Sequence, residues 1–125
     1  NVGSEISSAA YSFKKELKKA KSLLRKKNSD TEKTAVFGAC ATVNVMIEMG
    51  ELAEDIDFII DNSPTRVGRL HPSYDIPIIS VEEAKSKNIT NCLIGAWRHR
   101  KVIEKNNSSF FKNVQIVSAF EENWA

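Results

Sequence analysis

The sequence predicts an α/β fold in which helices cover both faces of a parallel sheet of about five strands. Short apolar runs recur along the chain, and segments with a helical spacing of apolar residues separate them. The clearest unit spans residues 34–64, where two apolar runs flank a Gly-Ala-Cys turn and a helix-like segment. Two buried strands joined through a helix form a βαβ unit, the opening half of a three-layer Rossmann-like sheet. Right-handed crossovers then predict the strand order 3-2-1-4-5.

Length and composition fit a single folded domain. The chain has 125 residues, of which 42% are hydrophobic and 27% are charged, as is typical of a globular protein. No apolar run approaches the roughly 18 residues of a membrane span, and no signal-peptide pattern opens the chain. Cys40 and Cys92 match no zinc-ligand spacing and are expected to be reduced thiols. We therefore expect a cytoplasmic protein with no membrane partner and no metal site.

Residues 1–30 are expected to form an amphipathic helix that leads into the α/β unit of residues 31–125. Apolar residues recur there at spacings of four and three, namely Ile6, Ala10, Phe13, Leu17, Ala20 and Leu24. Residues 1–33 hold nine Lys/Arg and four Asp/Glu, whereas the remainder holds nine and twelve. We interpret this charge as a solvated helix face and expect no nucleic-acid partner, because no interleaved aromatic or groove-fitting motif is present. The helix either packs along its own domain, which we favour, or connects to a preceding domain.

The remaining elements follow in order. Strands are predicted at residues 35–37, 56–60, 76–79, 92–96 and 114–119, and helices at 41–49, after Ser80 and at 98–106. Gly50 is the expected C-cap of the helix at 41–49. Ser80 begins a capping-box pattern that ends at Glu83. Pro77 places the third strand at an edge of the sheet, because proline cannot donate to a ladder of hydrogen bonds.

Ligands of an open parallel sheet bind beyond the carboxyl ends of the strands, where the strand order reverses. Here that position is the gap between the first and fourth strands, beside residues 38–44, 61–74 and 96–100. The first segment begins at Gly38 and ends at Asn44, but Cys40 and Val43 occupy the other glycine positions of a dinucleotide fingerprint. The turn still offers backbone N–H groups to an anion. Val43 disfavours tight packing around a pyrophosphate.

Four polar residues after the second strand are candidates for ligand binding. Asp61 comes 23 residues after Gly38, where dinucleotide-binding folds place a ribose-binding carboxylate; a simple strand-ending turn explains it equally well. Arg66, Arg69 and His71 gather three possible phosphate partners in one loop. Arginine suits this role because its planar guanidinium matches phosphate geometry.

A second basic cluster, Trp97-Arg98-His99-Arg100, follows the fourth strand. Its indole is suited either to stacking on a base or sugar or to packing at the edge of the core. His71 and His99 are the two residues that titrate near neutrality without perturbation, and neither has an evident nucleophile or metal ligand beside it in the sequence. We therefore expect a ligand-binding domain without a self-contained active site.

These motifs together resemble the C-terminal domain of the sugar C-methyltransferases, S-adenosylmethionine (SAM)-dependent enzymes that methylate nucleotide-linked deoxysugars. The family pattern has a G-A-S-A-K-G-N-like turn, a D-D-N-P-x-x-x-G-R-like loop, an I-P-I strand and an A-W turn. The chain offers, in that order, residues 38–44 (GACATVN), Asp61-Asn62-Ser63-Pro64 with Gly68-Arg69, Ile76-Pro77-Ile78 and Ala96-Trp97. The resemblance extends from about residue 13 to residue 120.

The resemblance implies a Rossmann-like domain that helps to hold a nucleotide-sugar substrate, while other domains bind SAM and zinc and carry the chemistry. It implies binding roles for the matching positions Gly38, Asn44, Asp61, Arg69 and Trp97. Thr42 and Val43 replace a Lys-Gly-like pair, which puts phosphate binding by that turn in question. The chain contains no methyltransferase motif and binds no cofactor under this interpretation. It is then one domain of a longer enzyme, with a methyltransferase domain upstream, or a stand-alone relative.

Three other functions stay open at this stage. One is an NAD(P)-binding module of an oxidoreductase, which Asp61 favours and the missing glycines disfavour. Another is the nucleotide-sugar-binding domain that precedes some sugar acetyltransferases, which shares the glycine turn and the D-x-x-P loop. The third is an assembly module that uses the apolar stripe of the first helix as its contact surface.

Overall fold

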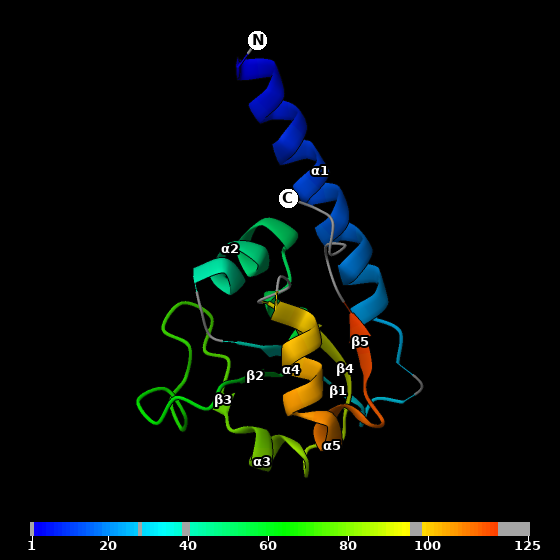
Figure 1. Ribbon diagram of the computed structural model, residues 1–125, viewed down its shortest axis with the longest axis vertical. Helices are drawn as coiled ribbons and strands as arrows, with labels where there is room; N and C mark the ends of the chain where they lie inside the picture. Colours follow the sequence, from blue (N-terminus) through cyan, green and yellow to red (C-terminus); the bar gives the residue numbers. More distant parts are fainter. Residues whose placement is uncertain (1, 28, 39–40, 96–98, 118–125) are drawn as a thin grey trace.

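The computed structural model describes residues 2–27, 29–38, 41–95 and 99–117 (Figure 1). Along the chain the elements are α1 (Val2–Leu24), β1 (Lys33–Phe37), α2 (Ala41–Gly50), the 3₁₀ helix η1 (Ala53–Asp55), β2 (Phe58–Ile60), β3 (Ile78–Ile79), α3 (Val81–Ala84), β4 (Ile89–Ile94), α4 (Arg100–Asn106), α5 (Ser108–Phe111) and β5 (Gln115–Val117). The alternation of strands and helices is the one that the apolar runs predict.

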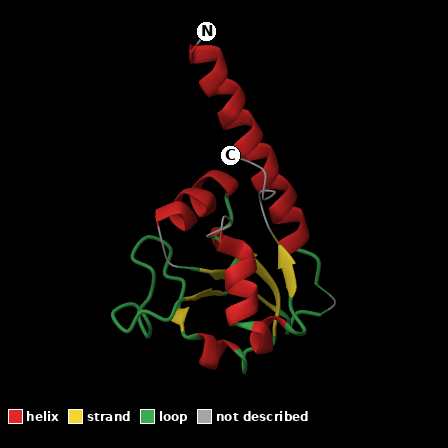
Figure 2. Cartoon of the chain, viewed as in Figure 1, coloured by secondary structure: helices red, strands yellow, loops and turns green. Residues whose placement is uncertain are grey.

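The five strands form one parallel sheet in the order β3-β2-β1-β4-β5. This order confirms the predicted Rossmann-like topology, with β1 at the centre and β3 at an edge. Helices lie on both faces of the sheet (Figure 2). The fold is therefore the three-layer α/β arrangement that the sequence predicts.

The two faces of the sheet carry separate apolar cores, because successive side chains of a strand point to opposite faces. On β1, Val36 belongs to the core under α1 and α2, whereas Ala35 belongs to the core under α3 and α5. The first core contains the buried helix residues Leu17, Ala20, Leu24, Val43, Met46 and Ile47. The second contains Val81, Ala84, Phe110 and Phe111. Burial on both faces explains why the central strands have continuous apolar sequences.

The C-terminal end of α1 is fixed to the sheet by two buried polar side chains. The Leu24 carbonyl accepts hydrogen bonds from Thr34 Oγ1 at 3.4 Å and from Asn91 Nδ2 at 3.3 Å. Asn91 Nδ2 also donates to the Lys26 carbonyl at 3.0 Å. A helix end leaves its last carbonyls without intrahelical partners, so these side chains satisfy groups that would otherwise be buried and unpaired. α1 thus packs along its own domain, as we favoured, while its first turns extend beyond α2 (Figure 1).

Several element boundaries differ from the prediction. β4 begins at Ile89, three positions before the predicted start, because the buried Asn91 that caps α1 interrupts the apolar run. Gly50 is the last residue of α2, but the left-handed conformation belongs to Glu51, with a φ of 52°. A Cβ at position 50 would lie 3.2 Å from Leu17 Cβ, so the glycine allows α1 and α2 to approach closely. The short helices η1 and α5 were not predicted.

The edge position of β3 is also explained by the loop that precedes it. The Gly68 N–H donates to the Ile78 carbonyl at 2.9 Å, and the Ile78 N–H donates to the Arg69 carbonyl at 2.8 Å. Leu70 and Pro77 form an antiparallel bridge beside them. Residues 68–71 therefore cover the outer edge of β3, which would otherwise present unpaired backbone groups.

Candidate functional site

A pocket of about 270 Å³ lies between α2 and the loop that follows β2. Its lining residues are Asn44, Thr65, Arg66, Arg69, Leu70, His71, Pro72 and Ile78. Four of the predicted binding residues, Asn44, Arg66, Arg69 and His71, are thus brought together. Two of them are separated by 27 positions in the sequence and meet because α2 and the loop both follow strands at the same edge of the parallel sheet.

Asp61 is not among the lining residues of this pocket and orders the start of the loop. Its Oδ1 accepts the Ser63 N–H at 2.9 Å, which closes a turn of the kind that aspartate side chains favour. Its Oδ2 accepts a hydrogen bond from Arg66 Nη1 at 3.1 Å. The strand-ending turn that the sequence offered as one interpretation of Asp61 is therefore present. Arg66 reaches the pocket with its charge already paired.

Arg69 differs from Arg66 in its surroundings. Its side chain is exposed and makes no ion pair or side-chain hydrogen bond within the described part of the chain. Its backbone is held by the hydrogen bond from Ile78 N–H to its carbonyl. A guanidinium on a fixed backbone, without a carboxylate partner, is available to an incoming anion.

His71 and Asn44 form a hydrogen bond across the pocket. His71 Nε2 and Asn44 Oδ1 are 2.7 Å apart, and the other ring nitrogen, Nδ1, accepts the Ser73 N–H at 3.1 Å. The His71 residue is 6% exposed. Both ring nitrogens are thus occupied, so His71 is a structural contact between the loop and α2 and has no free nitrogen for acid–base chemistry.

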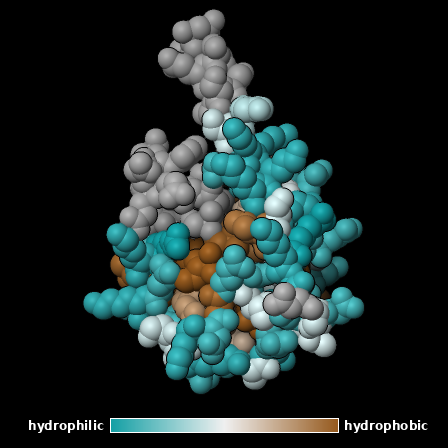
Figure 3. All heavy atoms as spheres, turned by 90° about the vertical axis from the view of Figure 1, so that its right-hand side faces the viewer, coloured by the Kyte–Doolittle hydropathy of each residue, from teal (hydrophilic) through white to brown (hydrophobic). Residues whose placement is uncertain are grey.

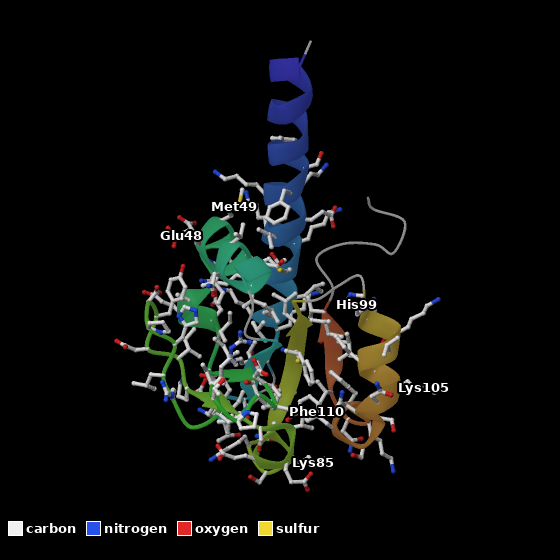
Figure 4. All side chains as sticks on the ribbon, turned by 60° about the vertical axis from the view of Figure 1, so that its left-hand side comes forward. Glu48, Met49, Lys85, His99, Lys105 and Phe110 are labelled. Carbon is white, nitrogen blue, oxygen red and sulfur yellow. The ribbon has the colours of Figure 1, made fainter. Side chains whose placement is uncertain are left out.

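A second contact between the same two segments lies beside the first. The Tyr74 hydroxyl donates to Glu48 Oε2 at 2.7 Å, and the Tyr74 ring lies against the His71 ring with 5.1 Å between centroids. The hydrogen bond to Glu48, with burial and the carboxylate charge as smaller causes, raises the pKa of Tyr74. Asn44 and Glu48 are four positions apart on α2 and so lie on one face of it. Glu48 lies in the last turn of α2, where Figure 4 labels it beside Met49.

The family assignment follows from the whole chain. The family described as the C-methyltransferase C-terminal domain matches residues 5–119. The chain belongs to this family. The resemblance seen in the sequence is thereby confirmed. Among curated proteins, none matches the chain.

Among the described residues of this C-methyltransferase C-terminal domain, the predicted positions Gly38 and His99 do not line the pocket. Gly38 has a φ of 106° and donates its N–H to the Ile60 carbonyl at 2.7 Å, so it makes the turn that leaves β1. His99 is exposed at the start of α4, on the opposite side of the molecule from Glu48 in Figure 4. Trp97 lies outside the described residues, and its binding role stays a prediction.

Val43 has a defined role in this C-methyltransferase domain. Its side chain is buried against Gly95 at the carboxyl end of β4, where a Cβ would come within 2.1 Å of Val43 Cγ2. In the dinucleotide fingerprint a glycine on the helix permits close packing on the sheet. Here the glycine directly follows the strand and the larger residue is on the helix, which argues against a dinucleotide site of the usual form.

Neither Tyr74 nor Glu48 was among the site residues predicted from the sequence, although Tyr74 is close to His71 along the chain. The i, i+4 spacing of Asn44 and Glu48 was the available hint, but it identifies a helix face and not its partner. Within the described residues no group of three or more His, Cys, Asp or Glu side chains is arranged to hold a metal ion. None of the helices in that part of the chain combines the length and apolar character required to cross a membrane.

Proposed function

We propose that this C-methyltransferase C-terminal domain holds a sugar nucleotide by its phosphate groups and contributes substrate binding, not chemistry. The observation that carries the proposal is the set of polar groups around the pocket. Arg69 is unpaired within the described residues, Arg66 is beside it, and no carboxylate is among the lining residues. Such a site favours an anion over a cation or a neutral ligand.

The size of the pocket supports binding of only part of a nucleotide sugar. Its volume of about 270 Å³ is slightly below that of most ligand pockets, which are roughly 300–1,000 Å³. A diphosphate fits this volume, while the base and the sugar extend beyond it. Trp97 and His99 remain candidates for contacts with those parts.

Binding without chemistry is consistent with the titratable groups. Both nitrogens of His71 are hydrogen bonded, and burial raises the pKa of the Cys92 thiol, which disfavours the reactive thiolate. SAM carries a sulfonium cation, which two arginines would repel, so the residues of this pocket do not fit that cofactor. We place SAM binding and methyl transfer in another domain of the enzyme.

The test is a titration of the chain by calorimetry with dTDP-glucose, UDP-glucose, GDP-mannose, NAD and SAM. We expect one class of nucleotide sugar to bind, and Arg69→Ala to weaken that binding by about 1.5–3 kcal/mol, or roughly 10- to 150-fold. Lys112→Ala is the control, because Lys112 is exposed and precedes β5 at the opposite edge of the sheet. Binding of NAD alone would favour the oxidoreductase alternative. Equal affinity in wild type and Arg69→Ala would reject the pocket.

A further inference from the structure

We propose that His71 is a positioning residue, which orients the Asn44 side chain so that its amide N–H groups face the anion pocket, and that Tyr74 and Glu48 hold His71 in this arrangement. The inference rests on the proposed function, since it names how the same pocket obtains one of its donors. It assigns to His71 a role other than the direct phosphate contact that the sequence predicted. Tyr74 and Glu48 are not among the pocket-lining residues and act through His71.

The hydrogen bonds of His71 define the tautomer of its ring. The Ser73 backbone N–H points at Nδ1 from 3.1 Å, and a backbone amide can only donate. Nδ1 must therefore carry a lone pair, which leaves the proton of the neutral ring on Nε2. The geometry of the turn supports this contact, because the His71 carbonyl accepts the Asp75 N–H at 2.9 Å and the His71 N–H donates to the Ile76 carbonyl at 2.8 Å.

The tautomer determines the orientation of Asn44. Because Nε2 carries the proton, the atom of Asn44 that lies 2.7 Å away must be the acceptor Oδ1. The amide nitrogen Nδ2 then points away from His71. No hydrogen bond of Nδ2 occurs within the described residues, so its two N–H groups are available in the pocket that Asn44 lines. In the other tautomer, with the proton on Nδ1, Nε2 would accept a hydrogen bond, and the Asn44 amide would have to be reversed so that Nδ2 donates to it.

Tyr74 and Glu48 support the His71 ring. The Tyr74 ring packs on the His71 ring, and its hydroxyl is held by Glu48 at 2.7 Å. Glu48 and Asn44 are one helical turn apart on α2. Both contacts therefore join α2 to the turn at residues 71–75, which the Asp75 N–H to His71 carbonyl hydrogen bond closes. Loss of the Tyr74–Glu48 bond frees the His71 ring to rotate and weakens its control of Asn44.

The ligand-independent test is the tautomer itself. A long-range proton–nitrogen NMR spectrum, recorded at a pH at which the His71 ring is neutral, distinguishes a protonated Nε2 from a protonated Nδ1. We expect protonation at Nε2 in wild type and in Asn44→Ala. Protonation at Nδ1 in wild type would overturn the inference, whatever ligand the pocket binds.

The binding test uses inorganic pyrophosphate, so that failure to bind any sugar nucleotide rejects the proposed function without ending this test. We expect Asn44→Ala to weaken pyrophosphate binding about tenfold, as the loss of one hydrogen bond to a charged group predicts. Asn44→Asp, which still accepts from His71 but places a carboxylate in the pocket, should weaken binding further. His71→Ala should weaken binding by no more than Asn44→Ala does.

The double variant separates positioning from direct contact. If His71 acts through Asn44, adding His71→Ala to the Asn44→Ala variant changes the pyrophosphate dissociation constant by less than about twofold. A further tenfold loss in that background means that His71 touches the ligand, and overturns the inference. Failure of pyrophosphate to bind wild type overturns it as well.

A conservative pair tests the support from α2. Glu48→Gln keeps an oxygen that accepts from Tyr74 and should bind like wild type, whereas Glu48→Ala and Tyr74→Phe should each weaken binding by roughly two- to fivefold. Affinity is measured well below the melting temperature, and stability is measured in parallel. Lower stability with unchanged pyrophosphate affinity in both Glu48→Ala and Tyr74→Phe would mean that the pair is only structural.

Discussion

The basic residues of α1 and those of the loop after β2 can be compared, and the more densely charged group, that of α1, is not the candidate site. In and just after α1, Lys21 and Arg25 pair with Asp55 at 3.6 and 2.7 Å, and Lys27 pairs with Asp57 at 3.6 Å. These cations thus pair with carboxylates of the segment after residue 33, which holds more acidic than basic residues. In the loop after β2, Arg66 has one carboxylate and Arg69 has none within the described residues. The density of basic residues in a sequence therefore indicates a binding site less well than does the presence or absence of a carboxylate partner for each cation in the fold.

The two groups also differ in what surrounds them. α1 presents a hydrophilic outer side in Figure 3, and its buried side is apolar. Lys21 Nζ donates to the Glu51 carbonyl at 2.6 Å, next to the C-terminus of α2, where a cation is favourable. Residues 68–71 instead hold their backbone against β3, and the Arg69 side chain makes no ion pair within the described residues. The first group thus forms ion pairs within the fold, and the second is the one that we propose as the ligand site.

The largest effect that should separate the two groups comes from the apolar contact beneath the α1 cations. Leu17 is fully buried, so Leu17→Ala should lower the free energy of unfolding by about 2–5 kcal/mol. The affinity of the folded protein for pyrophosphate should not change, because Leu17 belongs to the α1 side. Urea unfolding and calorimetry measure both quantities. Val102→Ala is the control, since Val102 is 58% exposed. A loss of affinity would show that the α1 side contributes to the site.

A smaller effect is expected from Asp55, the carboxylate that Lys21 and Arg25 share. Its side chain is 11% exposed, and Oδ2 accepts no hydrogen bond within the described residues although Lys21 Nζ lies 3.6 Å away. Asp55→Ala should cost about 1–2 kcal/mol of stability, less at high salt, because it leaves two cations without their partner. Glu54→Ala, which removes an exposed neighbouring carboxylate, is the control. Equal stability of the two variants would mean that the α1 cations contribute nothing.

Asp61 offers a comparison within the pocket itself. Asp61→Asn removes the negative charge that faces Arg66, so pyrophosphate should bind roughly two- to fivefold more tightly. If Asp61 also contacts a ribose, as one interpretation of the sequence holds, the same variant should weaken binding of the nucleotide sugar. Calorimetry with the two ligands separates these roles. Weaker binding of pyrophosphate would contradict the assignment of Arg66 to the anion pocket.

Much of the fold was predictable from the sequence because the alternation of apolar runs encodes it. Strand order, the edge position of β3 and the Ser80 cap, where Oγ accepts the Glu83 N–H at 3.1 Å, follow from local patterns. Asn91 was not predictable, because its partners are carbonyls at and just after the end of α1 that lie 65 and 67 positions away. For the same reason the arginines could be identified as candidates, while the partners that distinguish Arg66 from Arg69 could not.

The smallest expected effect concerns pH and the Tyr74–Glu48 bond. The pKa of Tyr74 is raised above its usual 10.0, chiefly because the hydroxyl donates to the Glu48 carboxylate. A raised folded-state pKa contributes stability that is fully present below pH 10 and is lost as the pH rises through the folded-state value. Wild type should therefore lose stability more steeply above pH 10 than Tyr74→Phe does, as measured by urea unfolding at several pH values. Tyr11→Phe is the control, because the Tyr11 side chain is 70% exposed and lies on α1. Parallel pH profiles for wild type and Tyr74→Phe would show that this bond does not hold the loop to α2, and the pocket wall would then depend on the His71–Asn44 contact alone.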